Sequence, residues 1–200
     1  MAGCLRMFVE CVQGPSFFKS NNHVRMEETP VVGLDTENLG SEVVILKNGR
    51  RICGTGGAIG NAPLVQNKSY FEVKVQQSGI WCIGLGTKKC DFNKLDETLK
   101  QQDVILLKDD SNVYQNGAVV ASGKQKIEEG DVIGVTYDHA EVEFYVNGEK
   151  FDCTVPAMKA TTVYPILFVD DGAILDVQFS DFYHRIPDGF DKIMLEQTLL

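Results

Sequence analysis

Three Asn-Gly pairs, each flanked by short apolar segments, constrain the fold of this chain more than any other feature. They lie at Asn48-Gly49, Asn116-Gly117 and Asn147-Gly148. A two-residue hairpin turn of the I′ type needs a positive φ at both central residues, which asparagine and glycine tolerate better than other residues. Each pair therefore predicts a tight antiparallel hairpin, and three in one chain predict a β-rich fold.

Alternation of apolar and polar residues identifies further strands and their faces. In segment 70–75 three apolar side chains alternate with Glu72 and Lys74, and segments 141–146 and 173–179 repeat the pattern. Segments 43–46, 131–137 and 164–169 are instead apolar on both faces, which predicts central strands covered on both sides. Helix is expected only as a turn or two within 96–107 and 191–200.

Many short strands with almost no helix predict an all-β fold, an antiparallel two-sheet β-sandwich. The chain shows no internal repeat and no low-complexity linker. We therefore expect one domain over 30–190, preceded by a flexible or partly ordered N-terminal tail (1–29) and followed by a short C-terminal extension (191–200).

Charge and cysteine usage narrow the class of protein. The net charge of −9 disfavours nucleic-acid binding, because phosphate neutralisation needs a basic surface. No stretch approaches the ~20 apolar residues of a membrane-spanning helix, and residues 1–14 resemble a secretory signal poorly, because they carry Arg6 and Glu10 and lack an uninterrupted apolar core. The six cysteines include no C-x-x-C pair, which gives a zinc site little support. A domain of this size does not need disulfides, so we expect reduced thiols in a cytoplasmic protein. Weak membrane association through an acylated Cys4 or Cys11 is an open alternative.

Candidate catalytic groups are few, and neither a cofactor nor a metal site is expected. Nothing around the three histidines resembles a nucleophile elbow. Glu141 and Glu143 share a strand face at a spacing compatible with an acid–base pair, so a carbohydrate-binding or glycosidase-like domain is the alternative. Asp170-Asp171-Gly172 is expected to be a turn rather than a cation loop, and the single tryptophan, Trp81, a core residue rather than a binding hot spot.

Several longer motifs follow one another in a characteristic order. The first motif is Tyr70-Phe71-Glu72-Val73-Lys74-Val75, and the second is Gly79-Ile80-Trp81-Cys82-Ile83-Gly84-Leu85-Gly86. Further motifs follow at 129–138, 143–148, 163–166 and 175–179. With an entry segment over 34–51, they make residues 31–182 resemble the SPRY domain family, of the PRY-SPRY type. The resemblance implies a bent sandwich of the concanavalin type. It also implies a non-catalytic interaction module, or adaptor, that binds a partner protein or peptide through loops at one end, and we expect a monomer.

The resemblance also implies which loops form the binding site. In peptide-binding members three loops build the pocket, and they map here to Arg50, Arg51 and Thr55, to Lys88, Lys89 and Asp91, and to Asp170 and Asp171. Two acids occupy the last loop, where peptide-binding members offer apolar and aromatic groups. We therefore expect a polar ligand, with basic groups meeting the aspartates or acidic groups meeting the arginines. The alternative is an interface elsewhere, such as a sheet edge.

Overall fold

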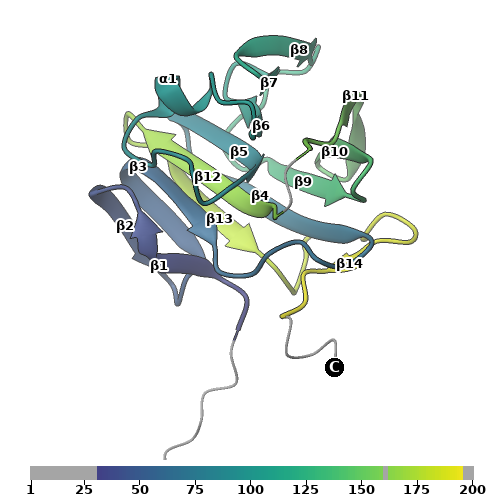
Figure 1. Ribbon diagram of the computed structural model, residues 1–200, viewed down its shortest axis with the longest axis horizontal. Coiled ribbons are helices and arrows are strands. Elements are labelled where there is room, and N and C mark those ends of the chain that lie inside the picture. The colour runs from purple at the N-terminus through teal and green to yellow at the C-terminus, as the bar shows by residue number, and fades with distance from the viewer. Residues whose placement is uncertain (1–30, 160–161, 196–200) are drawn as a thin grey trace, which may run out of the picture.

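Antiparallel hairpins form at all three Asn-Gly pairs in the computed structural model, which describes residues 31–159 and 162–195. The pairs at 116–117 and 147–148 make the expected two-residue turns, whereas the hairpin at Asn48-Gly49 closes with a four-residue loop, because Leu46 is opposite Arg51. The asparagine and glycine of every pair have positive φ, for example 55° at Asn116 and 76° at Gly117. The described residues contain fourteen strands and one helical turn (Figure 1). In chain order these are β1 (Leu34–Leu39), β2 (Glu42–Leu46), β3 (Arg51–Gly60), β4 (Ser69–Gln77), β5 (Ile80–Gly86), α1 (Leu95–Thr98), β6 (Ile105–Lys108), β7 (Asn112–Gln115), β8 (Ala118–Ser122), β9 (Val132–Tyr137), β10 (Glu141–Val146), β11 (Glu149–Pro156), β12 (Tyr164–Asp170), β13 (Ile174–Gln178) and β14 (Asp191–Lys192).

The strands form two sheets that share β3. The first sheet has the order β1-β3-β12-β5-β6-β7-β8, and the second has the order β2-β3-β13-β4-β9-β10-β11. All of these neighbours are antiparallel, and β14 adds a short parallel pairing to β4. The expected antiparallel two-sheet sandwich is confirmed.

Strand β3 crosses from one sheet to the other in its middle. Its first half pairs with β2, as far as Thr55, and its second half pairs with β12 from Gly56 onward. Gly54 makes this crossing possible, because its φ is +99° and a Cβ there would lie 2.2 Å from the carbonyl oxygen of Glu42. Only glycine fits a backbone that is both left-handed and this close to a neighbouring strand.

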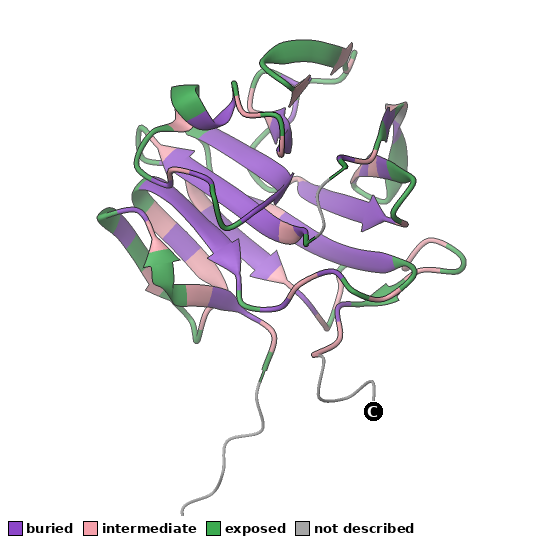
Figure 2. Ribbon diagram, viewed as in Figure 1, coloured by how far each residue is buried: buried purple, intermediate pink, exposed green. Residues whose placement is uncertain are grey.

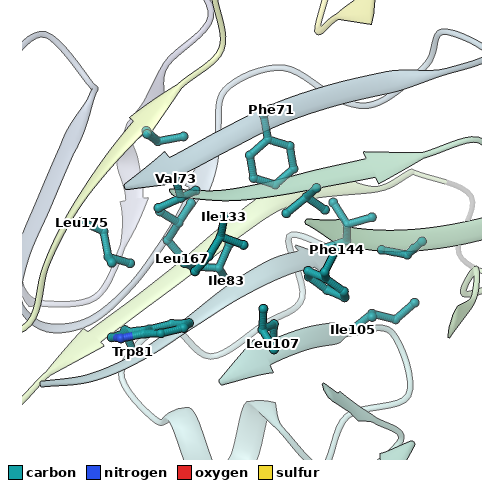
Figure 3. Close-up of a cluster of buried hydrophobic side chains, with 14 of the residues drawn as sticks. Phe71, Val73, Trp81, Ile83, Ile105, Leu107, Ile133, Phe144, Leu167 and Leu175 are labelled. Carbon is teal, nitrogen blue, oxygen red and sulfur yellow. The ribbon is translucent and has the colours of Figure 1, made fainter. Parts of the chain in front are cut away.

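The main core lies between the inner faces of the two sheets (Figure 3). The side chains that alternation placed on one face of their strands, such as Phe71 and Val73, point into this core. Each of the ten labelled side chains is at most 2% exposed. The second sheet contributes Phe71, Val73, Ile133, Phe144 and Leu175, and the first contributes Trp81, Ile83, Ile105, Leu107 and Leu167.

A second apolar cluster covers the outer face of the first sheet. Phe92, Leu99 and Val104, from the segment that contains α1, pack against Phe168 and other outward side chains of the sheet. The rings of Phe92 and Phe168 are 6.1 Å apart. Burial on both faces explains why β12 is apolar from Pro165 to Val169, as expected for a central strand (Figure 2).

The expectation that 43–46 is a covered central strand is wrong. Strand β2 lies at the edge of the second sheet and pairs with β3. Its outward side chains Val44 and Leu46 are 50% and 47% exposed. An apolar run alone does not distinguish a covered strand from an edge strand with apolar residues facing solvent.

The ends of the chain fall partly outside the described residues. The predicted tail over 1–29, with Cys4 and Cys11, lies outside them. At the other end, β14 pairs with β4 and Ile193 is buried in the core, while the boundary at residue 190 stays a prediction. Among the described residues, no helical segment combines the length and apolar character that crossing a membrane requires.

Replacing Gly54 tests the crossing of β3. Gly54→Ala should lower the free energy of unfolding by about 3 kcal/mol, since the methyl group meets a backbone carbonyl at a strained φ. Gly130→Ala is the matched control, because Gly130 also has a positive φ (+95°) but has no atom within 4 Å of its added Cβ. Urea denaturation measures the free energy of unfolding of both variants. An equal loss of stability in the two would contradict a tight crossing at Gly54.

Candidate functional site

Turns that connect the two sheets gather at one end of the sandwich, which we name the rim. The turn 77–79 leads from β4 of the second sheet to β5 of the first, and the turn 170–173 leads from β12 back to β13. Register places the two turns together, because Ile80 at the start of β5 is opposite Asp170 at the end of β12. The crossing point of β3 adjoins them, since Val169 is opposite Gly56.

Asp170 ties the last of these turns to β3. Its Oδ1 accepts hydrogen bonds from Thr55 Oγ1 at 3.0 Å and from the Asp171 backbone N–H at 2.8 Å. Asp171 and Gly172 have φ of +48° and +80°, and the Ala173 N–H donates to the Asp170 carbonyl at 3.0 Å. Asp170-Asp171-Gly172 is therefore a closed turn, and Asp171 stands exposed at its tip.

The two turns pack backbone against backbone. Gly79 has a φ of +159°, and a Cβ there would lie 2.5 Å from the Ala173 nitrogen and 2.6 Å from the Asp171 carbonyl oxygen. A side chain at position 79 would push the turns apart. The rim is thus held by main-chain contacts, which favours a surface formed before any partner arrives.

A hollow of ≈400 Å³ opens beside these turns, and we name it the rim hollow. It is lined by Ser78, Gly79, Trp81, Asp109, Lys126, Ile127, Glu128 and Glu129. Trp81 and Ile127 are 2% and 6% exposed, so they form an apolar base. Trp81 lies at the edge of the main core (Figure 3), as expected for a core residue.

The walls of the rim hollow are acidic. Three carboxylates face one ammonium group, and that group, Lys126 Nζ, lies 3.8 Å from Glu128. Asp109 is paired with Lys108 at 2.8 Å, and Glu129 accepts a long hydrogen bond of 3.4 Å from the Ser78 N–H. An apolar base under an excess of carboxylates suits a ligand that combines an apolar side chain with basic groups.

Arg50 and Arg51 lie away from the rim hollow, at the start of β3. The Arg51 guanidinium binds Asp176 on the outer face of the second sheet, with Nη2 2.8 Å from Oδ2, and Lys47 Nζ reaches the same oxygen at 2.9 Å. Burial of the Asp176 carboxyl opposes its ionisation, but the hydrogen bonds from Arg51 and Lys47 outweigh burial and lower its pKa. The Arg50 carbonyl accepts the Val177 N–H.

Lys88 and Lys89, the basic residues of the second predicted loop, are separated from the rim by the length of β5. Lys88 and Lys89 follow the end of β5, where Gly86 is opposite Tyr164, whereas Asp170 is opposite the start of β5. Asp91 lies in the segment that covers the first sheet, and its Oδ1 accepts the Asn93 N–H at 3.0 Å.

Three of the eight sequence-predicted residues are therefore brought together, namely Thr55, Asp170 and Asp171. The binding role of all eight stays a prediction. Sequence reasoning missed the acids of the rim hollow, Asp109, Glu128 and Glu129. The signal that could have found the last two is an acidic pair directly before Gly130, a turn residue that leads into a strand.

Glu143, one of the two carboxylates behind the glycosidase alternative, is held in a network of structural hydrogen bonds. Glu143 accepts hydrogen bonds from Lys150, Tyr145 and Thr154. Burial alone would raise the pKa of Glu143, but these contacts outweigh it and lower the pKa. A general acid needs a raised pKa, so Glu143 is poorly suited to protonate a leaving group.

Glu72 is fully buried and holds the C-terminal part of the chain over the second sheet. Its carboxylate accepts hydrogen bonds from Tyr70 Oη at 2.8 Å, from the Tyr183 N–H at 2.6 Å and from the His184 N–H at 3.0 Å. Alternation assigned Glu72 to the face opposite the core, and segment 182–184 covers it there. This carboxylate is fully occupied by structural donors.

Comparison with known proteins gives consistent matches. The sequence profile of the SPRY domain matches residues 68–181. The chain is 47% identical over 178 residues to SPRY domain-containing protein 7 of Gallus gallus, and 46% identical over 183 residues to that of Homo sapiens. Each match covers 88% of this chain and 90% of the relative.

Solved structures share the fold at low sequence identity. The SPRY domain of human HERC1 has a TM-score of 0.62 at 20% identity, covering 76% of this chain and 100% of that one. The TRIM65 PSpry domain has a TM-score of 0.62 at 12% identity, covering 74% of this chain and 88% of that one. At these identities the likeness concerns the fold alone.

Removing the charge of Asp176 tests the outer-face ion pairs. Folding lowers the pKa of Asp176. The stabilisation that its ion pairs provide is therefore present above about pH 4, the pKa of an aspartate in the unfolded chain, and is lost as the pH falls through the pKa of Asp176 in the folded protein. Asp176→Asn should therefore cost about 2 kcal/mol at pH 7 and progressively less in acid.

Chemical denaturation between pH 7 and pH 2 measures this difference. Asp188→Asn is the control, since Asp188 pairs with Arg185 but both side chains are almost fully exposed. The stability of the protein should barely change in this variant. A loss of stability in Asp176→Asn that did not depend on pH would contradict the pairing of an ionised Asp176 with Arg51 and Lys47.

Proposed function

Because this chain belongs to the SPRY domain family, we propose that it is a non-catalytic interaction module that binds a partner protein or peptide at the rim. SPRY domains generally act as protein-interaction modules, and the chain matches the family over most of its length. The observation that supports the rim in particular is the rim hollow, where buried Trp81 and Ile127 lie beneath acidic walls.

The chemistry of the rim hollow suggests the class of partner. Glu128 and Glu129 on one side and Asp171 on the adjoining turn are exposed, and together they outnumber Lys126. A basic segment with one apolar anchor could place that anchor against Ile127 and Trp81 and its cationic groups against the carboxylates. Such a segment agrees with the basic ligand expected from Asp170 and Asp171.

We also propose that the protein is a cytoplasmic monomer. Cys53, Cys82 and Cys90 are free thiols, and free thiols are common in proteins of reducing compartments. Burial raises the pKa of the Cys82 and Cys90 thiols, so both remain protonated and serve as small apolar side chains.

Charge reversal at the rim tests the proposal. The double variant Glu128→Lys with Asp171→Lys should reduce partner capture at least about tenfold, because it replaces two attractive charges by repulsive ones. Both side chains are exposed and Asp171 is not the residue that holds the turn, so the melting temperature should stay nearly unchanged.

The matched control is Glu141→Lys, an exposed reversal at the far end of the second sheet, where Val142 is opposite Tyr137. Quantitative pull-down with the whole chain compares the three proteins. Undiminished capture by the rim variant, or an equal loss in the control, would remove the rim from the binding site.

A further inference from the structure

A second hollow lies at the end of the first sheet opposite the rim, and we propose that it binds a phosphomonoester group. This basic hollow has a volume of ≈380 Å³ and is lined by Thr87, Lys88, Lys89, Asp103, Lys159, Thr162 and Tyr164. Its size falls within the range of about 300–1,000 Å³ typical of small-molecule sites. The proposal goes beyond the rim function, because the ligand is a small anion rather than a protein.

Strand register brings together all of the lining residues except Asp103, from two distant parts of the chain. Gly86, the last residue of β5, is opposite Tyr164, the first residue of β12. Lys88 and Lys89 follow the end of β5, while Lys159 and Thr162 precede the start of β12. Because β5 has seven residues, this end lies roughly 20 Å from the rim.

The charge of the basic hollow is opposite to that of the rim. Three lysines line it against one carboxylate, Asp103, in a chain whose net charge is −9. Asp35 of β1 is a further carboxylate within electrostatic reach of Lys88, and counting both acids still leaves an excess of positive charge. Among the described residues, none of the three ammonium groups lies within 4 Å of a carboxylate.

Neutral groups complete a site suited to phosphate. Lys88 Nζ lies 5.3 Å from the centre of the Tyr164 ring, which orients the ammonium group beside the hollow. Thr87 is 8% exposed, and its Oγ1 accepts the Lys89 N–H at 3.4 Å, so its hydroxyl hydrogen remains available as a donor.

The charge of a phosphomonoester matches this arrangement better than that of a carboxylate. A phosphomonoester carries about −1.5 to −2 charges at pH 7 and offers three acceptor oxygens. It can therefore pair with two lysines and a hydroxyl at once, whereas a single carboxylate would leave most of the positive charge uncompensated. A small phosphorylated metabolite and a phosphorylated lipid headgroup share this chemistry.

Nuclear magnetic resonance titration of the whole chain with inositol trisphosphate tests the proposal. Saturable amide shifts should be confined to residues 87–89, 103, 159 and 162–164, which line the basic hollow or adjoin it. The double variant Lys88→Gln with Lys159→Gln should weaken binding at least about tenfold, since each lysine near a bound phosphate contributes roughly a severalfold gain.

Matched controls separate the basic hollow from general charge effects. The double variant Lys100→Gln with Lys124→Gln removes two exposed lysines that do not line the basic hollow. The affinity of this variant for inositol trisphosphate should stay within about twofold of that of the parent protein. The rim variant Glu128→Lys with Asp171→Lys should bind inositol trisphosphate normally, so a failure at the rim is distinguishable from a failure here. Shifts spread over all surface lysines, or equal losses in both lysine variants, would overturn the proposal.

Vesicle flotation identifies the source of the phosphate. Flotation with vesicles that contain phosphatidylinositol 4-phosphate, but not with phosphatidylcholine alone, supports a headgroup when inositol trisphosphate competes. Binding of the soluble probe without flotation supports a free metabolite. A phosphotyrosine peptide that binds at least about tenfold tighter than inositol trisphosphate would overturn the assignment to a small ligand or headgroup.

Discussion

The crossing of β3 from the second sheet to the first is the constraint on which the rest of the structure depends. It joins the two sheets by a continuous strand, and it sets Thr55 beside the end of β12. The crossing is possible because Gly54 takes a backbone conformation that other residues resist, next to the carbonyl of Glu42. The position of the rim, and therefore of the proposed protein-binding surface, follows from this one geometric feature.

The chain separates its charges between the two ends of the first sheet. Acidic groups gather at the rim around the buried Trp81, while Lys88, Lys89 and Lys159 gather about one strand length away. Net charge alone would describe a uniformly acidic protein. The arrangement instead suits two ligands of opposite charge, a basic peptide segment at the rim and a phosphate group at the basic hollow.

Local sequence signals predicted the fold well because hairpins and alternation are short-range properties. Antiparallel hairpins at the Asn-Gly pairs and the core face of β4 formed as expected, and the ordered motifs indicated the SPRY family. Strand β6 was missed, since Ile105-Leu106-Leu107 is buried on both faces and such a run resembles a helix segment. The candidate site was only partly predicted, because the distance between Lys88 and Asp170 depends on the direction and register of β5, which no local pattern encodes.

Hydrogen exchange of the whole chain, free and bound to its captured partner, tests the central claim most directly. The account predicts that binding slows amide exchange in the turn 77–79, in 124–130 and in the turn 170–173, while the exposed edge strand β2 exchanges as before. Protection confined to β2 or to the outer face of the second sheet, with unchanged exchange at the rim, would contradict it.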